Sequence, residues 1–122
     1  MVYDKLGNGF DNAIIIRQMR LRQESRSYNL EYYTQGLYGS LSATIACNDY
    51  SGENLFLSIY GDDKRIYISP AFTDKSDPLD IVVEFETPYP RFIQIIVCDE
   101  KNAAFDVTNW GKLILNDLRF YE

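Results

Sequence analysis

Apolar and polar residues alternate with a period of two along much of this chain, and this alternation limits the fold more than any other feature. Over residues 79–86 nearly every second side chain is apolar, and residues 40–47 repeat the pattern. Successive side chains of a β-strand point to opposite faces, so such segments form strands with one buried face. No run of ten or more residues carries a convincing helical period. The sequence therefore predicts an all-β protein.

Further strands follow from the same reasoning. Residues 55–60 and 65–69 flank the turn residues Gly61-Asp62-Asp63, which predicts a hairpin. Residues 92–98 are nearly continuously apolar, as in a central strand covered on both faces. Strands are also expected over residues 12–16, 19–22, 28–33 and 113–121. Several short strands separated by turn signals favour an antiparallel β-sandwich of the jelly-roll or galactose-binding-like type.

The sequence shows no internal division. Its 122 residues contain no repeat, low-complexity run or linker, so we expect residues 1–122 to form one β-sandwich domain, either complete or excised from a larger protein. No stretch approaches the roughly 18 apolar residues of a membrane-spanning helix, which argues against membrane insertion. Residues 1–5 lack the basic start and apolar run of a signal peptide. The protein is thus expected to be intracellular, or to be a domain whose export signal lies elsewhere.

Composition excludes several functions. The sequence has no histidine, which removes Ser-His-Asp and Cys-His catalytic systems and His-based zinc sites. The formal net charge of −6 argues against nucleic acid as the main partner, because phosphate binding needs a basic surface. We therefore expect a binding or structural domain rather than an enzyme.

Acidic residues and cysteines give no specific motif. Asp and Glu cluster at 62–63, 74–80 and 99–100. Paired carboxylates can serve glycoside hydrolysis or bind Ca²⁺, but these positions also suit turns. No catalytic residue, cofactor or metal is predicted, and a structural calcium ion is the remaining alternative. Cys47 and Cys98 are expected to be buried reduced thiols on strands, and the alternative is a disulfide between them.

Residues 17–26 carry a positive net charge, whereas the rest of the chain is negatively charged. They contain four arginines and one glutamate, a local charge of +3. One interpretation is a patch for a carboxylate-bearing glycan, a phosphate or an acidic protein surface, with Arg20 and Arg22 as contacts. The other is a solvated strand face, since Met19 and Leu21 alternate with these two arginines.

Aromatic and polar side chains gather in segments that resemble a sugar site. Tyrosines occur at 28, 32, 33 and 38, and two apparent loops carry Asn48-Asp49-Tyr50 and Asn109-Trp110. Sugar binding needs aromatic faces against the ring and planar polar groups for the hydroxyls, and binding residues collect on loops. The candidate site is therefore Asn48, Asp49, Tyr50, Asn109 and Trp110. The alternative is that Tyr28, Tyr32 and Tyr38 pack in the core and Trp110 plugs a loop.

Most of the chain resembles the NPCBM-like domains, a family of carbohydrate-binding modules. The most recognisable elements are the hairpin at residues 59–64 and Asp117-Leu118-Arg119-Phe120-Tyr121 at the end of the matching segment 115–121. The other matching segments are residues 3–7, 11–14, 28–30, 36–38, 41–46, 48–50 and 69–70. The resemblance implies a β-sandwich appended to glycoside hydrolases or other bacterial proteins. It also implies non-catalytic binding of a glycan, often a galactose-type residue, at the loop rim.

Two functions remain open from the sequence. The first is a glycan-binding accessory module. The second is a protein-interaction or homo-oligomerisation sandwich that has lost sugar binding, since open sandwiches present exposed strand edges to partners.

Overall fold

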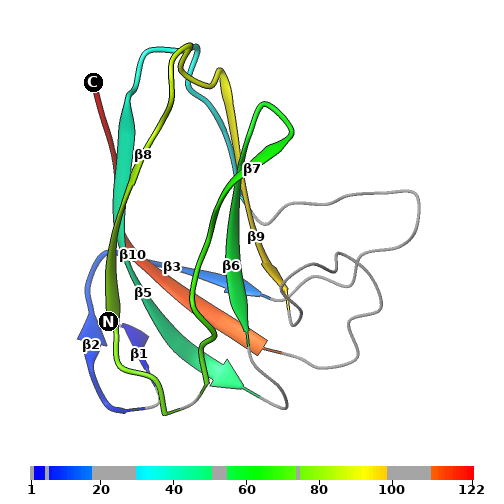
Figure 1. Cartoon of the computed structure of the whole chain (residues 1–122). Coiled ribbons are helices and arrows are strands. Elements are labelled where there is room, and N and C mark those ends of the chain that lie inside the picture. Colours follow the sequence, from blue (N-terminus) through cyan, green and yellow to red (C-terminus); the bar gives the residue numbers. More distant parts are fainter. Residues whose placement is uncertain (1, 5, 18–29, 51–54, 74, 99–110) are drawn as a thin grey trace.

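The computed structural model describes residues 2–4, 6–17, 30–50, 55–73, 75–98 and 111–122, which form strands and turns and no helix (Figure 1). The strands are β1 (Val2–Tyr3), β2 (Gly9–Phe10), β3 (Ala13–Arg17), β4 (Leu30–Tyr33), β5 (Ser40–Tyr50), β6 (Phe56–Gly61), β7 (Lys64–Ile68), β8 (Leu79–Glu84), β9 (Phe92–Cys98) and β10 (Gly111–Tyr121). The predicted strand over residues 19–22 lies outside the described ranges.

Two four-stranded antiparallel sheets form the body of the fold. The first has the order β3-β10-β5-β8 and the second the order β4-β9-β6-β7, while β1 and β2 pair separately. The two sheets lie face to face as two layers (Figure 1), and one buried apolar cluster draws residues from both. The predicted antiparallel β-sandwich is confirmed.

The alternation in the sequence becomes the inner face of each sheet. On β8, Ile81 and Val83 are buried in the core while Val82 between them is exposed. On β5, Leu41, Ala43 and Ile45 are buried in the same cluster. Polar residues between these positions face away, as the period of a strand requires.

Strand β9 is central and covered on both faces, as its sequence predicts. It lies between β4 and β6, and all five residues from Ile93 to Val97 are buried. Ile93, Ile95 and Val97 belong to the core cluster. Gln94 and Ile96 belong to the opposite face and are buried nonetheless.

The β6–β7 hairpin turns at Asp62 and Asp63, as predicted. Both have positive φ angles, 49° and 68°. Two left-handed residues in succession suit the twist of a hairpin, and aspartate tolerates this conformation better than most residues. The acidic pair at 62–63 therefore has a conformational role.

Candidate functional site

The described part of the sequence-derived site lies where β5 and β10 pair at one end of the first sheet. The backbone of Tyr50 pairs with Gly111, and Asp49 pairs with Lys112. The register shifts at Asn48, an extra residue on β5 that forms a β-bulge. Bulges bend a strand and are frequent beside binding sites, so this strand end has a backbone irregularity of the kind that sites use.

The predicted loop at Asn48-Asp49-Tyr50 is wrong, because these three residues are the end of β5. Strand β5 continues to Tyr50 because β10 begins at Gly111 and supplies a partner for its backbone. The polar composition of Asn48-Asp49-Tyr50 resembles a loop, but strand formation depends on pairing with a segment far along the chain.

Asn109, Trp110, Arg20 and Arg22 lie outside the described residues. Trp110 directly precedes Gly111, whose backbone pairs with Tyr50. Strand β3 ends on the other side of β10, where Arg17 pairs with Lys112. The ends of β3 and β5 and the beginning of β10 therefore lie together at one end of the first sheet, and each adjoins a segment of proposed contact residues in the sequence.

The tyrosines divide between packing and exposure. Tyr32 and Tyr38 both lie against Phe120, with ring centroids 5.3 Å and 5.6 Å from the Phe120 centroid. Tyr33 is 77% exposed and lies over Phe92, with ring centroids 4.6 Å apart and planes 14° from parallel. The core-packing interpretation holds for Tyr32, which packs against the core cluster, whereas Tyr38 is half-buried against Phe120. Tyr28 lies outside the described residues.

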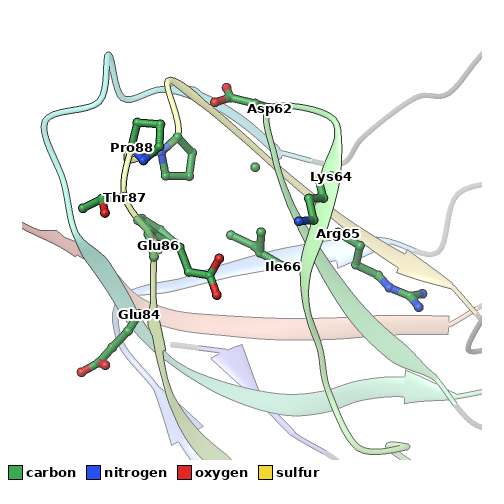
Figure 2. A pocket seen from close by; sticks show the side chains of 11 residues that line it. Asp62, Lys64, Arg65, Ile66, Glu84, Glu86, Thr87 and Pro88 are labelled. Atoms are coloured by element: carbon green, nitrogen blue, oxygen red, sulfur yellow. The ribbon is translucent and has the colours of Figure 1, made fainter.

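A pocket that sequence reasoning missed lies at the opposite end of the sandwich. It has a volume of about 460 Å³ and opens between the β6–β7 hairpin and the segment that joins β8 to β9 (Figure 2). It is lined by Gly61, Asp62, Lys64, Arg65, Ile66, Glu84, Phe85, Glu86, Thr87, Pro88 and Pro90. Such a pocket joins residues from separate strands, and no local motif could have revealed it.

A shallower polar hollow of about 300 Å³ lies on the outer face of the first sheet. It is lined by Ser42, Ala43, Thr44, Asp80, Ile81, Val82, Asp117, Arg119 and Tyr121. The hydroxyls of Ser42 and Tyr121 lie 3.0 Å apart, and Thr44 donates a hydrogen bond to Asp80. Several polar groups of this face are thus already engaged with one another.

Burial affects the titration of two phenol groups in the described part of the chain. Burial raises the pKa of Tyr32 and that of Tyr67 above the ordinary value of 10.0. Within the described ranges, no three Cys, Asp or Glu residues form a group that could hold a metal ion. In the same ranges, no helix has the length and apolarity to cross a bilayer. Cys47 is buried, and the side chain of Cys98 is not described.

No family model matches the chain, and no curated protein matches it. Among solved structures, the chain is similar to the CBM51 from Clostridium perfringens GH95 in complex with methyl-galactose. The TM-score is 0.54 at 13% sequence identity, and the match covers 98% of each chain. At this identity the likeness shows the fold, and it agrees with the antiparallel sandwich described above.

Two structures of Clostridium perfringens ZmpB also match. One contains the M60 catalytic domain with CBM51-1 and CBM51-2, with 11% identity and a TM-score of 0.47 over 92% of this chain and 15% of that chain. The other contains the CBM51-2 and INT domains, with 11% identity and a TM-score of 0.49 over 91% of this chain and 30% of that chain.

Proposed function

We propose that this domain is a non-catalytic carbohydrate-binding module. The observation that carries the proposal is the end-to-end likeness to a carbohydrate-binding module in complex with methyl-galactose, which covers 98% of both chains. Because a shared fold does not by itself establish a shared ligand, the proposal also draws on the residues of this chain.

The proposed binding site is the end of the first sheet where Tyr50 pairs with Gly111. Its contacts are Asn48, Asp49, Tyr50, Asn109 and Trp110. The aromatic side chains stack against the apolar face of a sugar ring, and the amide and carboxylate groups hydrogen-bond its hydroxyls. The backbone pairing of Tyr50 with the residue that follows Trp110 supports a common location for both segments.

The finer assignment is an NPCBM-type module for a galactose-type sugar. Arg20 and Arg22 follow β3, which ends beside the same strand pair, and they would contact a carboxylate on an acidic glycan. Residues 1–122 would act as one accessory domain attached to other domains of a larger protein.

A glycan array tests this function directly. The purified domain should bind galactosides above other neutral sugars, and Trp110→Ala and Tyr50→Ala should each weaken the array signal for galactosides. Tyr33→Ala is the matched control, because it removes an exposed aromatic side chain from the second sheet and should leave the signal unchanged. No signal across galactosides, acidic glycans and cell-wall fragments, together with a stable dimer by light scattering, would favour a protein-interaction domain instead.

A further inference from the structure

We propose that the pocket between the β6–β7 hairpin and the β8–β9 connection is a second saccharide site, built for one neutral sugar unit. It is separate from the site at the Tyr50 end. Ser40 pairs with Glu84 at the pocket end, and β5 runs ten residues from there to Tyr50. At about 3.3 Å per residue the two sites lie roughly 30 Å apart. The domain would therefore hold two sugar units at opposite ends.

The hairpin wall of the pocket is fixed before any ligand binds. The Asp62 carboxylate accepts hydrogen bonds from the backbone nitrogens of Arg91 and Phe92, each at 3.1 Å. A Cβ added to the neighbouring Gly61 would lie 2.9 Å from Cγ of Pro90, so only glycine allows the hairpin backbone to approach the Pro90 ring this closely. The hairpin is thus held against the start of β9.

The opposite wall is the segment that joins β8 to β9, and hydrogen bonds to the segment that joins β4 to β5 hold it in place. The Thr34 hydroxyl donates to the Pro90 carbonyl at 2.8 Å, and the Gly36 nitrogen donates to the same oxygen at 3.2 Å. The Phe85 nitrogen donates to the Gly39 carbonyl at 2.8 Å. A pocket with two anchored walls loses little conformational entropy on binding, which favours affinity.

The interior combines an apolar surface with polar groups on opposite sides. Phe85 and Pro90 are buried, and Ile66 lies between the walls (Figure 2). In Figure 2, Lys64 and Glu86 extend toward the pocket from opposite sides, whereas Arg65 and Glu84 point away from it. Among the described residues, no acidic group lies within 4.0 Å of the Lys64 ammonium as an ion pair. Both groups are available to a ligand.

This arrangement suits a neutral sugar. Lys64 offers donors and Glu86 offers acceptors, and a sugar hydroxyl can both accept and donate. The apolar surface of Ile66 and Pro90 fits the C–H face of a ring. Acidic and basic side chains both line the pocket, so it does not favour a strongly charged ligand of either sign. A volume of about 460 Å³ lies within the range of small-molecule sites.

The test is a two-dimensional NMR titration of the ¹⁵N-labelled chain with methyl glycosides of galactose, glucose and mannose. At least one should shift the amide signals of residues 64–66 and 85–87. Lys64→Met and Glu86→Gln should each weaken that binding by about tenfold, since each removes a charge-assisted hydrogen bond. Asp63→Asn is the matched control: it removes a neighbouring charge outside the pocket and should leave the binding curve unchanged.

Three results would overturn the second site. The first is that no neutral glycoside shifts the amide signals of residues 64–66 and 85–87. The second is that Lys64→Met and Glu86→Gln bind the glycoside as tightly as the wild type. The third is that glucosamine or N-acetylneuraminic acid binds more tightly than every neutral sugar. Amides of residues 45–47 and 113–115 report on the Tyr50 end in the same spectra, and Trp110→Ala should not affect the pocket. Failure of one site is therefore distinguishable from failure of the other.

Discussion

Asp62 and Phe92 are hydrogen-bonded in both directions. The Asp62 nitrogen donates to the Phe92 carbonyl at 2.9 Å, and the Phe92 nitrogen donates to the Asp62 carboxylate at 3.1 Å. The same carboxylate accepts from the Arg91 nitrogen. One turn residue of the β6–β7 hairpin thus caps the beginning of the central strand β9.

Replacing this carboxylate should destabilise the domain. Asp62→Ala removes the acceptor for two backbone donors and places alanine at a φ of 49°, so we expect the free energy of unfolding to fall. The loss should be about 2 kcal/mol, measured by urea denaturation. Asp63→Asn keeps a residue tolerant of positive φ and should change stability by less than about 0.5 kcal/mol. Equal stability of Asp62→Ala and wild type would contradict the capping role.

A methyl group at Gly61 should also destabilise the fold. Its Cβ would contact the Pro90 ring at 2.9 Å, and Gly61→Ala should cost about 1–3 kcal/mol by overpacking. In the double variant with Pro90→Ala the ring is absent, so the further cost of Gly61→Ala should largely disappear. Additive losses in this double-mutant cycle would show that the two residues do not act on each other.

The buried side chain of Gln94 should lower the free energy of unfolding of the domain. Its side chain is 5% exposed, and its Oε1 has no hydrogen-bond partner among the described residues. Gln94→Leu has a similar size and removes the unpaired acceptor, so the free energy of unfolding should rise by about 1 kcal/mol. Gln94→Glu should instead be strongly destabilising, because it buries a charge. A loss of stability in Gln94→Leu would reveal that the amide is needed.

Alkaline pH should weaken the fold through two partly buried tyrosines. Burial raises the pKa of Tyr32 and of Tyr67, so above pH 10.0 the unfolded chain releases these phenol protons more readily than the folded one. The stability they contribute is present below pH 10.0 and is lost as pH rises through the higher folded pKa. Urea midpoints should fall across this range, and Tyr32→Phe with Tyr67→Phe should flatten the decline. An unchanged slope in that variant would exclude them as the cause.

The sequence predicts the strands well where hydrophobic patterning alone determines burial. Residues 92–98 form β9 with the expected bounds, because a central strand needs apolar side chains on both faces. The hairpin at Gly61-Asp62-Asp63 is equally local, since turn residues specify it. By contrast, the extension of β5 to Tyr50 depends on β10, and no pattern near Tyr50 reveals that partner.

The candidate sites are less predictable than the strands. Tyr32 and Tyr33 are adjacent and chemically identical, yet one packs on Phe120 and the other is exposed, because alternation places them on opposite faces. The pocket requires Lys64 and Glu86 to face each other from separate segments, and only the folding of the two sheets brings these together.

Isothermal titration calorimetry with methyl-galactose, on wild type and on the Tyr50→Ala/Trp110→Ala double variant, tests the central claim most directly. A module that binds sugar at the Tyr50–Gly111 end should give saturable heat in the wild type. The double variant should bind at least about tenfold more weakly while its thermal unfolding midpoint stays unchanged. No saturable heat with methyl-galactose or any glycan selected on the array, or equal affinity of the double variant, would contradict the account.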